Sequence, residues 1–297
     1  MNMDSNFARN VVHIGLGKTM TTTLQNDIYP ELLRILKLNC NNEINKVDLA
    51  AQAVDDLTFD FKDLKKINGG FYSCESLYGW DPDFWLRGSE VVDYVFGKES
   101  TIIITLRDPK DLLRSVYQQS YAVGHYKSID DFFDLEKCRN ISKYGRSDEC
   151  FCLENFSYEY LINIYRKKFK EVYVIPYEFI PSLNFLRDIY NLDDITHSIL
   201  RDRFKKSKKN NSSYSNISMK LCNLKASLYK KINYTNQSSF EKEIWKKFLL
   251  NFIEPIFSNQ SKRFELNIEH IFDVNKSQVL YQNIVNKSKI DGFLAYK

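Results

Sequence analysis

A segment near the start of the chain, residues 11–25 with the sequence VVHIGLGKTMTTTLQ, constrains the fold more than any other. It begins with a short apolar run that predicts a buried β-strand, and it ends in apolar positions at helical spacing. Between them lie two glycines (Gly15 and Gly17), a lysine (Lys18) and a cluster of threonines. This order of strand, glycine-rich turn and helix binds phosphate, because backbone N–H groups converge on the anion and the helix start adds its positive dipole end.

Threonine hydroxyls and the lysine ammonium add further hydrogen-bond donors to such a turn. We therefore expect residues 15–23, which we call the phosphate cradle, to hold a phosphate group. The candidate binding residues are Gly15, Gly17, Lys18, Thr19, Thr21, Thr22 and Thr23. The alternative is an ordinary strand–turn–helix with an incidental lysine.

The spacing of the cradle differs from that of a Walker A loop, which requires Gly-x4-Gly-Lys-Ser/Thr. Gly17, Lys18 and Thr19 match the end of that pattern. The position of its first glycine is occupied by Val12, inside the predicted strand. The turn is therefore too short for the phosphate loop of a nucleoside triphosphatase.

A second candidate phosphate element lies further along the chain. Residues 101–106 are apolar and β-branched, which is typical of a central parallel strand. Asp108, followed by proline, predicts the start of a helix. Arg107 then stands at the carboxyl end of the strand, and Ser115 lies two turns into the helix. An arginine suits bidentate phosphate binding, because its guanidinium is planar and always charged.

Together the two elements resemble the cofactor-binding motifs of sulfotransferases that use 3′-phosphoadenosine 5′-phosphosulfate (PAPS), in particular the bacterial and glycan-type members. In that family the first strand is followed by Lys-Thr-Gly-Thr-Thr or Lys-Ala-Gly-Thr-Thr. Here residues 18–22 are Lys-Thr-Met-Thr-Thr, with Met20 in place of the glycine. The family's arginine at a strand end and its serine eight positions later, which bind the 3′-phosphate, correspond to Arg107 and Ser115. The resemblance covers about residues 10–270 in the order of elements and is specific only in these two motifs.

The resemblance implies an α/β fold, a P-loop-like three-layer sandwich whose central parallel sheet is flanked by helices. We expect a single sulfotransferase domain over residues 1–297, with a cofactor-binding core at about 10–190 and a helical C-terminal part at about 195–297. The implied reaction moves the sulfuryl group of PAPS to a hydroxyl or amine and leaves adenosine 3′,5′-bisphosphate. The expected acceptor is a glycan or a lipid-linked sugar.

Two catalytic roles follow from the same resemblance. Lys18 is expected to stabilise the bridging oxygen as the sulfuryl group leaves. Glu75 follows a predicted second strand at residues 71–74 and is the candidate general base, with His125 as the second choice. No metal is needed for this chemistry. The alternatives are that Glu75 caps a helix and that His125 is a surface or structural histidine.

The strongest run of charge, residues 201–210, is typical of a solvated loop. In the resembled family a basic segment near the C-terminus closes over the cofactor, so the resemblance makes Lys205 and Lys206 candidate cofactor contacts. Elsewhere the pattern predicts a helix and a strand after residue 156, an irregular stretch at 121–150 and a late helix at 240–257. Residues 272–297 show no clear pattern.

Two other classes of function stay open. A P-loop-type kinase needs the metal-binding aspartate of a Walker B strand directly after the apolar run, but Thr105 occupies that place and Asp108 precedes a proline. A non-catalytic scaffold that keeps the nucleotide fold is favoured by one feature, Met20 in place of glycine.

The composition excludes several partners. A chain of 297 residues with 43% hydrophobic and 27% charged residues is an ordinary globular protein that can bury a substantial core. The net charge of +4 is too small to indicate nucleic acid or a membrane surface. No apolar run reaches the ~18 residues of a membrane span, and the first residues lack a signal-peptide pattern, so we expect a cytoplasmic protein. The six cysteines are expected to be reduced, and the four histidines show no metal-ligand spacing.

Overall fold

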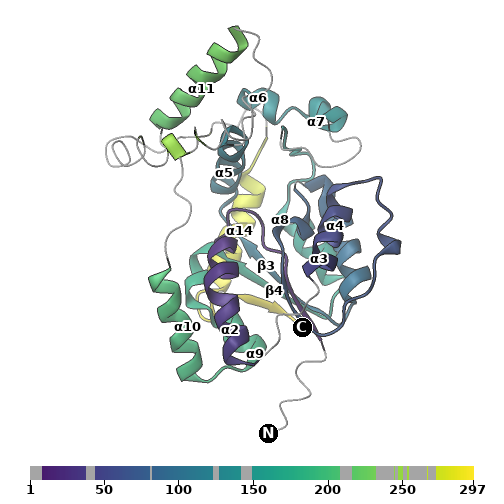
Figure 1. Cartoon of the computed structure of the whole chain (residues 1–297). Coiled ribbons are helices and arrows are strands. Elements are labelled where there is room, and N and C mark those ends of the chain that lie inside the picture. Colours follow the sequence, from purple (N-terminus) through teal and green to yellow (C-terminus); the bar gives the residue numbers. More distant parts are fainter. Residues whose placement is uncertain are drawn as a thin grey trace.

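One five-stranded sheet runs through the protein in the spatial order β2-β1-β3-β4-β5. Its strands are β1 (Asn10–His13), β2 (Gly70–Ser73), β3 (Thr101–Leu106), β4 (Glu171–Pro176) and β5 (Leu294–Tyr296). Figure 1 labels two of these strands, β3 and β4. The computed structural model describes residues 9–37, 44–80, 82–122, 127–141, 149–207, 216–231 and 272–297, together with residues 244, 247–249, 253 and 266.

Helices and short helical turns connect the strands. The α-helices are α1 (Thr21–Thr23), α2 (Tyr29–Ile35), α3 (Ile44–Asp55), α4 (Pro82–Phe96), α5 (Pro109–Ala122), α6 (Ile129–Phe132), α7 (Leu135–Ile141), α8 (Tyr158–Arg166), α9 (Asn184–Tyr190), α10 (Asp194–Lys206), α11 (Asn216–Lys231) and α14 (Asn275–Lys287). The π-helical turn is η2 (Leu24–Ile28), and the 3-10 turns are η3 (Phe61–Asp63), η4 (Glu75–Tyr78) and η5 (Tyr177–Ser182). The chain is helical throughout α1, η2 and α2, so Pro30 lies in the first turn of α2 without breaking the helix.

Strands β1 to β4 are parallel, and β5 pairs antiparallel with β4. Strand β1 lies between β2 and β3, so that Val12 pairs with Tyr72 on one side and with Ile102 on the other. All six residues of β3 are buried, as the apolar sequence of a strand covered on both faces requires. The central strand expected at residues 101–106 is confirmed.

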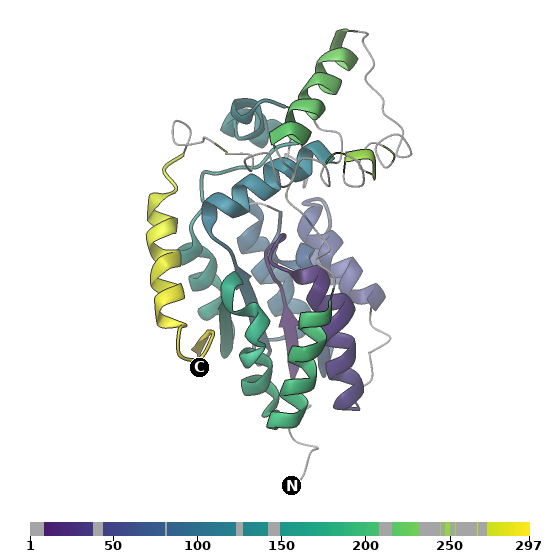
Figure 2. The ribbon, with the colours of Figure 1, turned by 90° about the vertical axis from the view of Figure 1, so that its left-hand side faces the viewer.

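Alternate side chains of the strands enter two hydrophobic cores, one on each face of the sheet. Val11, Ile103 and Tyr173 pack against η2, α2, α9 and α10. Val12 and Ile102 pack against α3, α4, α8 and α14. Figure 2 shows α2 and α10 on the side of the sheet that faces the viewer. The expected α/β class with a mostly parallel central sheet is confirmed, and the helices on both faces are compatible with a three-layer sandwich.

Three segments differ from expectation. Residues 121–150 contain the short helices α6 and α7 rather than being irregular throughout. The charged run at 201–210 lies largely within α10, because His197 and Leu200 bury one face of that helix. The terminal residues 272–297 form α14 and β5, so the C-terminal part contributes a strand to the core sheet.

The helix and the strand expected after residue 156 are confirmed as α8 and β4. The late helix expected at 240–257 falls mostly outside the residues that the structure describes. Within the described ranges, no helix is long and apolar enough to cross a membrane.

Candidate functional site

The two predicted phosphate elements meet at the point where the strand order reverses. The chain leaves β1 for β2 on one side and later returns to β3 on the other, so the carboxyl ends of β1 and β3 border a topological switch point. In open α/β sheets, ligands bind in the crevice at such a point. The phosphate cradle follows β1, and Arg107 follows β3, so both lie where this rule places a ligand.

The backbone of the cradle is bent into an unusual shape. Lys18 and Met20 have φ angles of 69° and 60°, the left-handed conformation that residues with a side chain rarely adopt. Alternation of ordinary and left-handed residues is the pattern of anion-binding nests of N–H groups. Met20 therefore has the backbone conformation that favours glycine, at the position where the sulfotransferase pattern has a glycine.

The helix that begins within the cradle, α1, has no side-chain cap. Met20 is its N-cap residue and makes no side-chain capping hydrogen bond. The first N–H groups of a helix have no acceptor within the helix, so those that follow Met20 are donors of the kind that bind an anion. Thr22 and Thr23 are half-buried and Thr21 is buried in the first turn.

Arg107 and Ser115 are in direct contact. Nη1 of Arg107 donates a hydrogen bond to Oγ of Ser115 at 2.9 Å and another to the carbonyl oxygen of Lys18 at 3.2 Å. The guanidinium lies over the ring of Tyr177 at 5.0 Å, and its Nη2 is 3.9 Å from a carboxylate oxygen of Asp111. The arginine of the second element is thus bonded to the backbone of the first.

The Nε atom of Arg107 is buried and has no hydrogen-bond partner among the residues that the structure describes. Buried donors are almost always satisfied in folded proteins, so a donor of this kind beside a serine hydroxyl fits an anionic ligand. The carboxylate of Asp111 also pairs with Arg114, whose Nη2 lies 2.5 Å from its Oδ1. Because Asp111 is shared in this way, much of the positive charge of Arg107 is uncompensated. The geometry therefore fits a phosphate group held by Arg107 and Ser115.

The loop that carries Arg107 is braced from the side of α8 and α14. The hydroxyl of Tyr158 donates to the carbonyl oxygen of Arg107 at 2.5 Å, and the Gln278 amide donates to the Asp108 carboxylate. Burial, with the nearby Asp108, raises the pKa of Tyr158 well above its usual value, so this hydroxyl keeps its proton. The C-terminal helix α14 thereby helps to position the arginine, a role that its polar sequence did not indicate.

Glu75 lies beside the cradle. One of its carboxylate oxygens is 3.6 Å from the place that a Cβ atom on Gly17 would take, and the Tyr78 hydroxyl is 3.7 Å from the same place. The N–H of Gly17 also points at the Tyr78 hydroxyl, at 3.5 Å. Cys74, rather than Glu75, is the N-cap residue of η4. Glu75 is therefore close to the cradle, and its role as a general base stays a prediction.

Two cradle residues have structural tasks that sequence reasoning did not foresee. The Thr19 hydroxyl is fully buried, donates to the Leu16 carbonyl and lies 2.6 Å from the Thr105 hydroxyl. The backbone N–H of Thr19 is therefore the part of this residue that can serve an anion, and its place among the candidate binding residues stays a prediction. A Cβ atom on Gly15 would overlap with His13 and Thr105, so Gly15 is needed for space.

His13, Ser73, Gln25, Tyr78 and Thr105 are the residues near the cradle that sequence reasoning missed. The signal that could have found three of them is polarity at the carboxyl ends of apolar strands, namely His13 in β1, Ser73 in β2 and Thr105 in β3.

The basic helix α10 contacts η2, the helical turn that follows the cradle. Arg203 donates to the carbonyl oxygen of Asp27 in η2 at 2.6 Å. Lys205 donates to Asp202 at 3.1 Å, within its own helix. No contact recorded in the described part of the chain joins Lys205 or Lys206 to the cradle, so their role stays a prediction. His125 lies outside the described residues.

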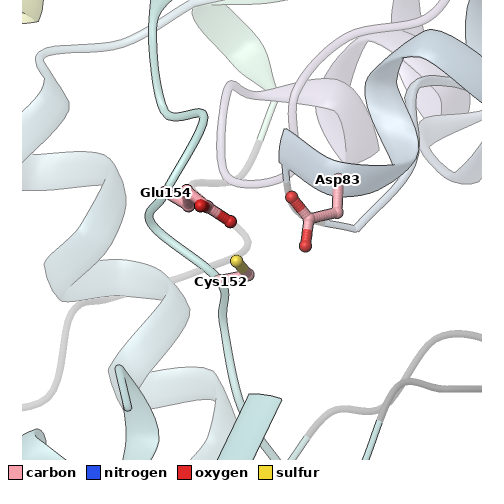
Figure 3. Close-up of side chains that lie close together, drawn as sticks. All are labelled: Asp83, Cys152 and Glu154. Carbon is pink, nitrogen blue, oxygen red and sulfur yellow. The ribbon is translucent and has the colours of Figure 1, made fainter. Parts of the chain in front are cut away.

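A cluster of possible metal ligands lies elsewhere, where α4 begins near the segment before α8. Atoms of Asp83, Cys152 and Glu154 lie within 4.8 Å of one another (Figure 3). Both carboxylates already have protein partners, because Glu154 accepts from Arg139 and Asp83 accepts from Asn155. We therefore assign no metal to this cluster.

The chain matches no protein-family model, no curated protein and no solved structure. What can be concluded about its function rests on the residues and the geometry of the site.

Proposed function

We propose that this protein is a sulfotransferase that moves the sulfuryl group of PAPS to a hydroxyl or amine of an acceptor. The observation that carries the proposal is the bond of Arg107 to both Ser115 and the backbone of Lys18. Two phosphate-binding elements joined in this way suit a nucleotide with a phosphate on each side of its ribose. The alternative, an ordinary strand–turn–helix with an incidental lysine, does not explain why Arg107 and Ser115 lie against the cradle.

The proposed roles of the residues come from the resemblance, and the positions of the residues are compatible with them. When bound, PAPS supplies a sulfuryl group activated on the 5′-phosphate. The cradle N–H groups and the hydroxyls of Thr21, Thr22 and Thr23 would bind the phosphosulfate, and Arg107 and Ser115 the 3′-phosphate. Positioned donors of this kind act by holding the reactants and by stabilising developing charge.

Lys18 and Glu75 would carry the transfer itself. Lys18 stabilises the oxygen from which the sulfuryl group departs, because its ammonium is a compact positive charge. Glu75 accepts the proton of the acceptor hydroxyl or amine, a contribution of about 10²–10⁴-fold to the rate. On the resemblance alone, we propose a glycan or a lipid-linked sugar as the acceptor.

The kinase alternative is disfavoured by Thr19 and Thr105. In a Walker A loop the threonine after the lysine binds Mg²⁺ through its hydroxyl. Here that hydroxyl is buried against Leu16 and Thr105, and Thr105 takes the place of the Walker B aspartate. The scaffold alternative rested on Met20, whose left-handed backbone provides the conformation of the missing glycine.

Thermal unfolding with adenosine 3′,5′-bisphosphate, beside ATP with Mg²⁺, tests the proposal. A ligand that binds only the folded state stabilises it by ~2.7 kcal/mol at a hundred times its Kd. Stabilisation by the bisphosphate alone is the expected result. Stabilisation by ATP with Mg²⁺ alone would favour a kinase, and no stabilisation by either would favour the scaffold.

A further inference from the structure

A line of polar side chains crosses the carboxyl ends of three strands beneath the cradle. The ring of His13 is fully buried, with Nδ1 2.8 Å from the Ser73 hydroxyl and Nε2 3.4 Å from the Thr105 hydroxyl. The Thr105 hydroxyl lies 2.6 Å from that of Thr19. At the other end, Nε2 of Gln25 lies 3.1 Å from the Ser73 hydroxyl. The line thus joins β2, β1 and β3 to the cradle.

On the cradle side, the line of hydrogen bonds ends at the Leu16 carbonyl oxygen, and this acceptor fixes the direction of every bond before it. The Leu16 carbonyl can only accept, so the Thr19 hydroxyl donates to it. A hydroxyl has one hydrogen, and Thr19 must therefore accept the hydrogen of Thr105. With its own hydrogen engaged, Thr105 can only accept from His13, which places a proton on Nε2 of the imidazole.

The other half of the line agrees with this assignment. A neutral imidazole with its proton on Nε2 has a bare Nδ1, which accepts from the Ser73 hydroxyl. Ser73 in turn accepts from the Gln25 side chain. The same Gln25 atom lies 3.3 Å from the Ser73 carbonyl, which can only accept, so this end of the amide is its NH₂ group. The hydrogen bonds therefore run in one direction from Gln25 to Leu16.

Two further observations support the assignment, one on the charge of His13 and one on its contact with Thr105. Burial lowers the pKa of His13 to about 3, so the ring is uncharged at neutral pH. Gly15 leaves the space in which His13 and Thr105 meet, because a Cβ atom there would overlap with both. A hydrogen-bond chain of one direction is strengthened by mutual polarisation of its members.

We propose that His13, as the neutral tautomer with its proton on Nε2, is a positioning residue of the phosphate cradle. Through Thr105 it fixes the hydroxyl of Thr19, which in turn holds the Leu16 carbonyl and closes the turn around Lys18. His13 does not touch the ligand. The nature of the anion rests on the proposed function, whereas the tautomer and the chain of hydrogen bonds do not.

Calorimetric titration of adenosine 3′,5′-bisphosphate into a set of β3 variants tests the effect on binding. Thr105→Val keeps the shape of the side chain and removes the hydroxyl, and Thr105→Ser restores it. Thr101→Val is the matched control, because Thr101 is an equally buried threonine on the same face of β3 whose hydroxyl bonds to Glu171 at 3.0 Å, away from the cradle.

We expect Thr105→Val to weaken binding by about five- to tenfold, because the valine can neither accept from His13 nor donate to Thr19, and one such hydrogen bond contributes about 1 kcal/mol. Thr105→Ser and Thr101→Val are expected to bind within about twofold of the wild type. Unchanged binding by Thr105→Val, or equal losses in the two valine variants, would overturn the proposal.

Nitrogen-15 NMR of the histidine rings gives a readout that needs no ligand. The His13 signals are identified by their absence in His13→Gln. We expect a protonated Nε2 and a bare Nδ1 from about pH 5 to 8. A proton on Nδ1, or a charged ring at about pH 6, would overturn the proposal. If the wild type binds no bisphosphate, the proposed function fails, and the NMR spectrum still tests the tautomer of His13 and the direction of the hydrogen bonds.

Discussion

Replacing His13 with glutamine should remove a specific part of the pH dependence of stability. In the folded protein, burial lowers the pKa of His13 to about 3, whereas an unfolded histidine titrates near 6.5. Between these values the unfolded chain binds a proton that the folded protein does not. Acidification therefore favours unfolding, with a slope that approaches ~1.4 kcal/mol per pH unit well below pH 6.5.

Integrated from about pH 7.5 to about pH 5, this linkage lowers the free energy of unfolding by ~2 kcal/mol. Urea unfolding of the wild type and of His13→Gln across this range measures it. Glutamine does not titrate, and the carboxylates are the same in both proteins, so the difference between the two free energies isolates His13. The difference should shrink by ~2 kcal/mol on acidification. A difference that stays constant would show that the folded ring accepts a proton as readily as the unfolded one, and would refute the reasoning.

Three further substitutions test the site. Lys18→Ala should abolish sulfuryl transfer, measured as release of adenosine 3′,5′-bisphosphate from PAPS, while bisphosphate binding is mostly retained; normal transfer would exclude Lys18 from catalysis. Glu75→Gln should lower kcat by about 10²–10⁴-fold with little change in KM, and near-normal turnover would end its candidacy as the base. Gly15→Ala should destabilise the protein by ~1–3 kcal/mol in urea unfolding, because the new Cβ overlaps with His13 and Thr105; an unchanged midpoint would show that this region relaxes easily.

The parts of the fold that the sequence predicts are those with a strong local pattern. Strand β3 is a run of apolar, β-branched residues, and Asp108 accepts from the N–H of Lys110 at 3.0 Å at the start of α5. Arg107 and Ser115 are joined by one strand end and two helical turns, so their contact depends only on local structure. Local spacing placed both residues near one strand end, and the resemblance to sulfotransferases singled them out as a pair.

Features that depend on the order of the strands could not be predicted in the same way. The contacts of His13 with Ser73 and Thr105 join residues far apart in the sequence, and they exist only because β1 lies between β2 and β3. Strand β5 has three residues, too few to show an alternating pattern. Helix α10 was not predicted from its charged sequence, because only His197 and Leu200 on it are buried and two such residues give no clear apolar pattern.

The central claim is that Arg107 and Ser115 recognise a second phosphate. Calorimetric titration of adenosine 3′,5′-bisphosphate and of adenosine 5′-monophosphate into the wild type and into Arg107→Ala tests it most directly. A charge-assisted hydrogen bond contributes ~1.5–3 kcal/mol, so the wild type should prefer the bisphosphate by about tenfold or more. Arg107→Ala should lose this preference while binding the monophosphate as before. Equal affinity of the wild type for both nucleotides, or a preference that survives in Arg107→Ala, would contradict the account.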